Sequence, residues 1–315
     1  MKQTKIPLEP SATSPVVTSP LPAADSPRNR LPWINAFLAA VALAYFTPLR
    51  VWAGYAWHSE VHSYTLLVPL LSAYLLHLRR PHLPRPGRPA FVLAAVCAIV
   101  AVLGRVAWMD RNSETPLLSH DDALSAAIAS FVCLIGAGGF LLLGRRWMAA
   151  AAFPVAFLIF MVPLPDAAVD SLEKMSMAGS AEIADWLFGI GGVPALRDGF
   201  VFQLPTITIR VAQECSGIRS SLVLFITSVL AAHLFLRTGW RRAALVAFII
   251  PLGLLRNGFR ILVIGWLCVH VGPEMIHHAI HKRGGPVFFA LSLPILLAWL
   301  WWLRRGEMKR AAPNS

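Results

Sequence analysis

The sequence predicts an all-α polytopic membrane protein with about eight transmembrane helices and an outward insertion made of a short amphipathic helix and a β-hairpin. Hydrophobic residues make up 57% of the 315-residue chain and charged residues only 14%, whereas about a quarter of an ordinary soluble protein is charged. The apolar residues form long runs, as membrane-spanning helices require, and do not show the alternation of a transmembrane barrel. Basic blocks also alternate with base-poor loops along the chain, which is how multi-pass proteins encode their orientation.

The expected domain organisation follows from these runs. Residues 1–31 are rich in Pro, Ser and Thr and predict a disordered cytoplasmic tail. A transmembrane domain then covers 32–304, and 305–315 form a basic cytoplasmic tail. The expected spans are 33–51, 65–78, 89–108, 123–143, 147–163, 217–236, 243–271 and 285–303. The run 243–271 counts as one crossing, because a second crossing would place the C-terminal basic block on the outer side.

Charge distribution sets the predicted orientation. The loops 109–122 and 164–214 are net acidic. The basic blocks lie at 28–30, 79–88, 145–146, 237–242 and 304–310, next to the opposite ends of the expected spans. The positive-inside rule therefore places both termini and the basic blocks in the cytoplasm and the acidic loops outside. The net charge of +12 lies in these short blocks, so we expect a lipid bilayer and no nucleic acid as partner.

The outer loop 164–214 contains two kinds of pattern. Residues 166–188 place apolar side chains at roughly helical spacing with charges between them, which predicts an amphipathic helix. Residues 200–212 alternate and are β-branched, which predicts a short hairpin with its turn at 204–206. This hairpin leads directly to Cys215.

The stretch AQECSGIRSS is the first candidate for chemistry. Cys215 stands between Glu214 and Arg219 at the expected start of a helix, where free backbone N–H groups and a nearby cation favour the thiolate. Gly217 permits a close approach to the backbone. A buried structural thiol with charges reaching to the interface is the alternative, and the local pattern leaves both open. Cys97, Cys133 and Cys268 lie in apolar runs and are expected to be small buried hydrophobes.

Two further clusters carry charge or proton-transfer groups. Arg256, Asn257 and Arg260 occur within LLRNGFRI, where each membrane-embedded charge costs about 3 kcal/mol, so function is favoured over snorkelling at a helix end. A histidine cluster follows, and histidine suits proton transfer near neutral pH. No HExxH motif or carboxylate partner accompanies it, so we expect no metal and no cofactor. The cluster consists of His270, His277, His278 and His281.

In combination, these motifs resemble the exosortase/archaeosortase family. The matching segments are Cys215–Ser220 (CSGIRS), Asn257–Arg260 (NGFR) and His281 with Gly285 and Phe289, and the early stretch HSYTLLVPLLSAYLL is similar to the second helix of that family. The resemblance covers about residues 35–303. It implies a membrane cysteine transpeptidase with Cys215 as nucleophile and with Arg260 and His281 completing a catalytic triad. Glu214, Gly217, Arg219, Arg256, Asn257 and His278 are the expected supporting residues.

The resemblance also implies a substrate class and a location. Substrates are expected to be membrane-anchored proteins with a PEP-CTERM-like C-terminal signal: a Pro-containing motif, a transmembrane helix and a basic cluster. Cleavage through a thioester is expected on the periplasmic side of a bacterial inner membrane, with exopolysaccharide machinery as a further partner. The alternatives are a multi-spanning transporter and a non-catalytic assembly component for exopolysaccharide export. A rhomboid-like GxSxG serine and a paired-glutamate peptidase motif are absent from the sequence.

Overall fold

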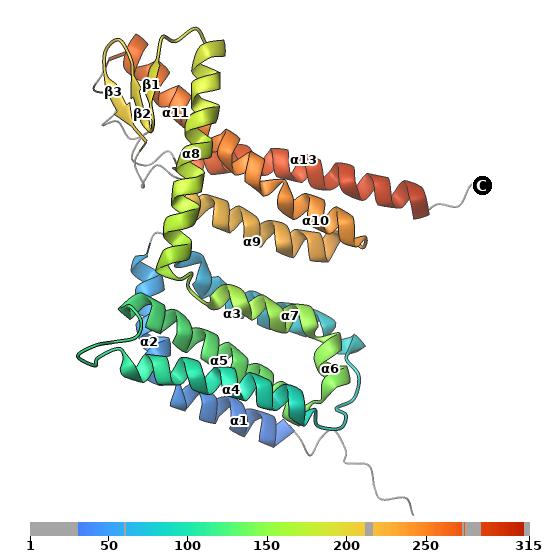
Figure 1. The fold of residues 1–315 in the computed structure, drawn as a ribbon. Helices are drawn as coiled ribbons and strands as arrows, with labels where there is room; N and C mark the ends of the chain where they lie inside the picture. Colours follow the sequence, from blue (N-terminus) through green and yellow to red (C-terminus); the bar gives the residue numbers. More distant parts are fainter. Residues whose placement is uncertain (1–30, 60, 212–216, 273, 275–284, 312–315) are drawn as a thin grey trace, which may run out of the picture.

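The computed structural model describes residues 31–59, 61–211, 217–272, 274 and 285–311, and these residues are mostly helical. Two groups of helices run roughly alongside one another, and one long helix, α8 (Asp166–Ile190), crosses both groups (Figure 1). The segment that precedes α8 meets it at a bend of 86°. The expectation of a mainly helical membrane protein is therefore confirmed.

The first helix group precedes α8 and has its own apolar core. Trp52, Leu124, Ile128 and Phe157 are buried at its centre, and Trp52 Nε1 donates to the Met161 carbonyl at 3.1 Å. The elements are α1 (Leu31–Ala44), α2 (Phe46–His58), η2 (Ser63–Leu67), α3 (Val68–Arg79), η3 (Arg80–His82), α4 (Phe91–Asp110), α5 (His120–Leu142), α6 (Arg145–Ala150), α7 (Ala152–Phe157) and η4 (Leu158–Met161).

The second helix group follows the insertion. It contains α9 (Ile218–Phe235), α10 (Gly239–Ala247), α11 (Ile249–His270) and α13 (Gly285–Ala311). Buried leucines from α9, α10, α11 and α13 form its core. The last helix continues to Ala311, beyond the boundary expected at residue 304, because 304–311 contains no proline and the single Gly306 weakens a helix without ending it.

The expected count of eight spans is not confirmed. Among the described residues, five helices are long and apolar enough to cross a membrane, and the number rises to seven if each of two bent pairs is one span. The run 33–51 is divided by a 68° bend between α1 and α2, and 147–163 is divided into short pieces. Within 65–78, η2 precedes an α3 of only 12 residues. In contrast, 239–270 qualifies as one span of 32 residues, in agreement with a single crossing.

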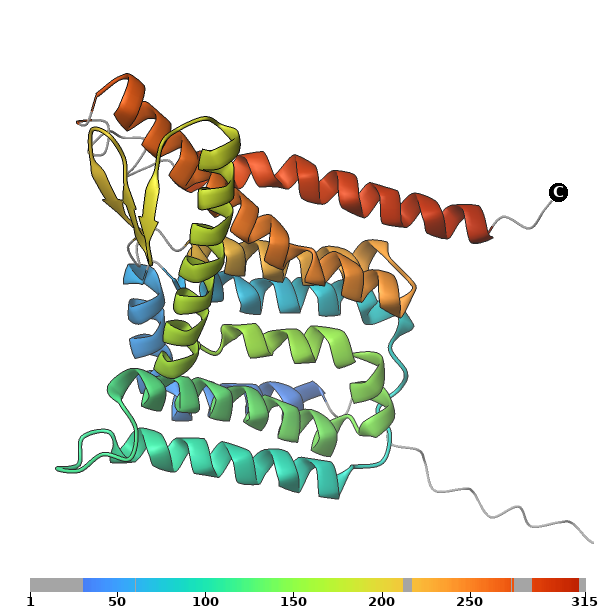
Figure 2. The same cartoon turned by 45° about the horizontal axis from the view of Figure 1, so that its top comes forward.

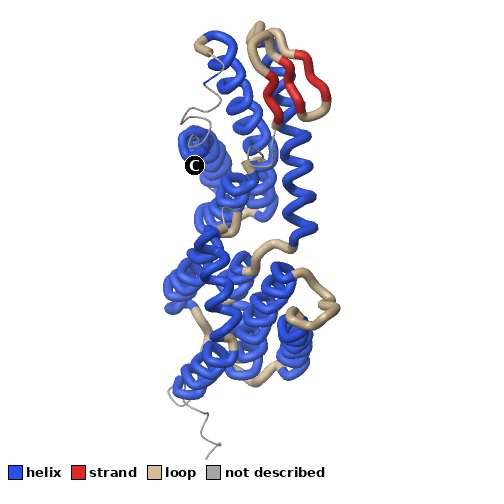
Figure 3. Tube along the Cα trace, turned by 90° about the vertical axis from the view of Figure 1, so that its left-hand side faces the viewer, coloured by secondary structure: helices blue, strands red, loops and turns tan. Residues whose placement is uncertain are grey.

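The insertion contains the expected helix and hairpin together with an additional strand. β2 (Val201–Gln203) and β3 (Thr208–Arg210) pair antiparallel, with Phe202 opposite Ile209. β1 (Leu196–Asp198) adds a third antiparallel strand, which the sequence did not indicate because LRD shows no alternation. The small sheet lies beside the C-terminal part of α8 (Figure 3).

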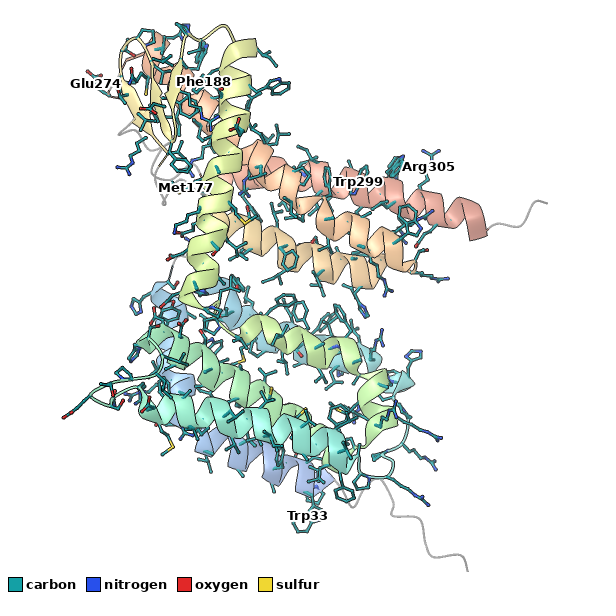
Figure 4. The ribbon with its side chains drawn as sticks, viewed as in Figure 1. Trp33, Met177, Phe188, Glu274, Trp299 and Arg305 are labelled. Carbon is teal, nitrogen blue, oxygen red and sulfur yellow. The ribbon has the colours of Figure 1, made fainter. Side chains whose placement is uncertain are left out.

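Glycines of α11 let α8 pack closely against it. A Cβ at Gly258 would lie 2.6 Å from Ile183, and one at Gly265 would lie 2.7 Å from the Phe188 ring. Phe188 is marked on α8 in Figure 4, and its ring centroid is 5.4 Å from that of Phe202 in the sheet. Close backbone approach through small residues is the usual way in which membrane helices pack. This packing fixes α8 across α11.

The two ends of the helix groups differ in charge. α8 and the sheet lie at one end, here called the α8 end (Figures 1 and 2). The turn between α9 and α10, the segment 80–90 and the C-terminal end of α13 lie at the opposite end. That end, here called the basic end, carries Arg79, Arg80, Arg85, Arg88, Arg237, Arg241, Arg242, Arg304 and Arg305. The separation is the one that the alternating basic blocks predict.

Candidate functional site

The chain enters α9 through a left-handed turn at Gly217. Its φ angle is +68°, a conformation that favours glycine, and it forms the N-cap of α9. The Gly217 carbonyl accepts from the Ser221 N–H at 3.0 Å and from Ser220 Oγ at 2.9 Å. The turn therefore fixes the backbone two residues after the position of Cys215.

Arg256 reaches this turn from α11. Its side chain is buried, and its Nη2 donates to the Gly217 carbonyl and to Ser221 Oγ, both at 3.0 Å. A Cβ at Gly217 would lie 3.1 Å from Arg256 Nη2 and 3.1 Å from Asn257 Oδ1. The close approach expected at Gly217 thus corresponds to a guanidinium and an amide, and the turn requires glycine for its φ angle and for space.

Neutral groups accept the hydrogen bonds that the structure describes for the Arg256 guanidinium. Within the described part of the chain, Arg256 forms no salt bridge, and its buried Nη1 has no hydrogen-bond partner. Arg260 lies one helical turn further along α11 and is half-buried, and Asn257 is buried between them. An arginine pair of this kind in an apolar helix, with no acidic partner for Arg256 among the described residues, favours a negative charge nearby.

The structure locates only part of the predicted site. It brings Gly217, Arg256 and Asn257 together, with Arg260 on the next turn, and Arg219 is exposed on α9. Glu214, Cys215, His278 and His281 lie outside the described residues, so their arrangement stays a prediction. The expectation that the histidine cluster holds no metal also stays a prediction; among the residues that are described, no group of three potential ligands could hold one.

The sequence did not point to Ser221, which connects the turn to Arg256. Its Oγ accepts from Arg256, and a Cβ at Gly253 would lie 2.9 Å from that Oγ. Gly253 therefore leaves space for the serine where α9 and α11 meet. The available signal was a serine one helical turn after Gly217 and a glycine three residues before Arg256.

An apolar hollow of about 220 Å³ adjoins the same arginine. It lies between α8, α11 and α13, and its walls include Leu187, Phe259 and Phe288. Arg256 borders this hollow and also contacts Gly217, so a group held in the hollow would be close to the turn that follows Cys215.

Comparison with known proteins identifies the family. A family model described as transmembrane exosortase matches residues 56–298, which include all the described residues of the turn and of the arginine pair. No curated protein and no solved structure matches the chain. Because the family match spans well over half of the chain, the protein belongs to the transmembrane exosortase family.

Proposed function

We propose that the protein is an integral-membrane cysteine protease or transpeptidase that cleaves C-terminal sorting signals of exported proteins. The observation that carries the proposal is the convergence of Arg256 and Asn257 on Gly217, two residues after Cys215. Arg260 of the same helix lies one turn away. Charges inside a membrane segment are retained mainly where they act, and here Arg256 contacts the turn two residues after Cys215, the only cysteine whose neighbours in the sequence are polar.

The proposed reaction uses three side chains. The Cys215 thiolate attacks a peptide carbonyl, and Arg260 stabilises the resulting oxyanion with its fixed positive charge. The C–N bond then breaks while His281 gives a proton to the leaving amine, which leaves a thioester on Cys215. An acceptor amine or hydroxyl, or water, attacks the thioester next. His281 takes the proton of this nucleophile, and the Cys215 thiolate is regenerated.

The apolar hollow suits an apolar side chain of the substrate's transmembrane helix. Its walls come from α8, α11 and α13, and its one charged residue is Arg256. A substrate helix in this position would run from the α8 end, where the peptide is cut, towards the basic end. Shallow apolar grooves between helices offer the van der Waals contacts that associate helices in a bilayer.

The orientation and partners belong to the same proposal. With the basic end in the cytoplasm, the α8 end and Cys215 face the periplasm of a bacterial inner membrane. Membrane-anchored proteins with a Pro-containing motif, a helix and a basic cluster are the proposed substrates. Exopolysaccharide machinery is the proposed wider partner.

The test is replacement of the nucleophile in the native host. Cys215→Ala and Cys215→Ser should both accumulate the uncleaved form of a substrate that carries a C-terminal helix and basic tail, followed by gel mobility. Cys133→Ala, in α5, is the matched control and should process normally. Enzyme levels should be equal in all strains. Normal processing in the Cys215 variants would disprove the thiol mechanism and favour a transport or structural role.

A further inference from the structure

A second hollow lies at the basic end, remote from the candidate catalytic site. Its volume is about 620 Å³, and its walls come from the end of α9, the start of α10 and the end of α13. Gly217 lies at the other end of α9, which is about 27 Å long at ~1.5 Å per residue. The hollow is therefore separate from the chemistry proposed for Cys215.

The charge of this hollow is strongly unbalanced. Four arginines line it, against one acidic residue, Glu307. No salt bridge within the described ranges involves any of these arginines. The lining arginines are Arg237, Arg241, Arg242 and Arg304.

Glu307 is already engaged by the backbone. Its carboxylate accepts from the N–H of Arg237 at 3.0 Å and from the N–H of Thr238 at 2.7 Å, where α10 begins. The Glu307 carboxylate is thus itself the anion at this helix start, where the free N–H groups of a helix N-terminus favour negative charge. The arginine charges around it remain available for a second anion.

The arginines divide into two that hold the walls and two that face outward. Arg241 is buried and donates from Nη1 to the Leu303 carbonyl at 2.8 Å, and Arg242 Nε donates to the Leu236 carbonyl at 2.8 Å. Arg237 and Arg304 are exposed, and Arg304 lies over the Phe235 ring at 5.8 Å. Arg241 and Arg242 therefore stabilise the walls, and Arg237 and Arg304 can contact a ligand.

The rim of the hollow is apolar. Phe235, Trp240 and Met308 line it and are exposed. Exposed tryptophan and long cationic side chains are typical of the membrane–water boundary. Figure 4 marks Arg305 on the same terminal part of α13. A ligand that fits must therefore combine a negative head with an apolar body.

From this arrangement we propose that the hollow binds the phosphate headgroup of an anionic phospholipid. A single arginine guanidinium can donate two parallel hydrogen bonds to phosphate oxygens, and basic pockets between helices on the cytoplasmic side suit such headgroups. A volume of about 620 Å³ exceeds what a bare phosphate ion needs, and the apolar rim provides a surface for the acyl chains. The bound lipid would hold together α9, α10 and α13, which support the site at the far end of α9.

The test uses the purified full chain in mixed micelles of phosphatidylglycerol and phosphatidylcholine. Lipid retained on the protein is measured by native mass spectrometry, and the thermal midpoint is measured with each lipid and with inorganic phosphate. The double variant Arg237→Gln/Arg304→Gln removes the outward pair. Arg85→Gln/Arg146→Gln is the control, since it removes the same charge from exposed positions outside the hollow.

We expect the wild type and the control to retain phosphatidylglycerol and to gain thermal stability from it. The double variant should lose about 25-fold in apparent affinity, roughly fivefold for each arginine that contacts an anionic headgroup. If the double variant and the control lost the same affinity for phosphatidylglycerol, the proposal would be overturned, because the effect would then arise from the general surface charge. Equal stabilisation by inorganic phosphate would overturn the lipid as the ligand and leave a free-anion site.

Discussion

Buried arginines of neighbouring helices lie near each end of α9, and their surroundings differ. At the α8 end, Arg256 is buried within an apolar helix and donates to a backbone carbonyl and a hydroxyl. At the basic end, Arg241 is also buried and also donates to a backbone carbonyl, but exposed arginines and an open hollow surround it. Arg256 and Arg241 are therefore similar in burial and hydrogen bonding. They differ in their position along the membrane-spanning segment.

Position along the span decides what each charge costs. A cation at a helix end reaches the headgroup region, so its presence there follows from orientation signals alone. A cation within the span costs about 3 kcal/mol or more, and it indicates a functional site with a specific partner. On this basis, Arg256 should matter for activity, whereas Arg241 should matter for stability. The first prediction tests that difference.

Arg256→Gln should slow substrate processing by about 100-fold, because a reacting group displaced by about 1 Å loses that much. The reason is the loss of the bond from Nη2 to the Gly217 carbonyl, which fixes the turn after Cys215. Arg241→Gln, the matched variant at the basic end, should lower the thermal midpoint but leave processing intact. Both are measured as the rate of substrate conversion at equal enzyme level.

The rate of Cys215 alkylation by iodoacetamide distinguishes positioning from simple loss of fold. Arg256→Gln should change this rate at a temperature where the protein remains folded, and Arg241→Gln should not. If both variants reduced processing and stability in parallel, the assignment of different roles to the two arginines would be wrong.

Gly217→Ala is expected to have the next largest effect. The left-handed φ angle of +68° strains any residue with a Cβ, by about 1–2 kcal/mol. In addition, the new methyl group would lie 3.1 Å from Arg256 Nη2 and from Asn257 Oδ1. We therefore expect both a lower thermal midpoint and slower processing.

Two other glycines separate these causes. Gly192 has a φ angle of +64° with no neighbour within 4 Å of an added Cβ, so Gly192→Ala reports the backbone strain alone. Gly239 has open space and no left-handed φ, so Gly239→Ala should be nearly neutral. If Gly217→Ala were no worse than Gly192→Ala, the contact with Arg256 and Asn257 would contribute nothing.

Patterns that depend on neighbouring residues were readable from the sequence. The amphipathic spacing of 166–188 predicted α8, and the alternation of 200–212 predicted the pairing of β2 with β3. The glycine in CSGIRSS predicted a close approach at residue 217. Each of these signals is local, because side-chain period and φ preference act within a few residues.

Breaks within apolar runs were not readable in the same way. Hydropathy is high on both sides of the bend between α1 and α2, so the run 33–51 appeared continuous. Pro48, in the first turn of α2, was the available signal, since proline is favoured at a helix start. The contact of Ser221 with Arg256 joins positions 35 residues apart, and spacing along the chain does not reveal such a pair.

His62 provides the smallest predicted effect and a pH test of the α8 end. It is buried, its Nδ1 bonds to Ser59 Oγ at 3.2 Å, and its Nε2 accepts from the Leu164 N–H at 3.3 Å. Burial lowers the pKa of His62 below its usual 6.5, although Asp121 and Asp166 act in the opposite direction. The Tyr55 ring lies against the imidazole, with 5.3 Å between the ring centroids and the planes tilted by 34°. A proton on Nε2 would also remove the bond from Leu164.

The sign of the pH effect follows from the lowered pKa. Between the folded and unfolded pKa values, the unfolded chain binds more protons, so stability increases with pH and is complete above about 6.5. As the pH falls below 6.5, we expect a loss of at most about 1.4 kcal/mol of unfolding free energy per pH unit. The thermal midpoint in one detergent from pH 7 to 5 measures this slope.

His62→Gln should flatten that slope, since glutamine does not titrate. His58→Gln is the control, because His58 is exposed and bonds only to the Gly54 carbonyl of its own helix in the described structure. If the dependence of the thermal midpoint on pH were unchanged in His62→Gln, protonation of His62 would not destabilise the folded protein. The hydrogen bond from Leu164 would then contribute nothing measurable to holding the segment before α8. A flatter slope would show that the hydrogen bond from Leu164 to a neutral imidazole helps to hold α8 in place across both helix groups.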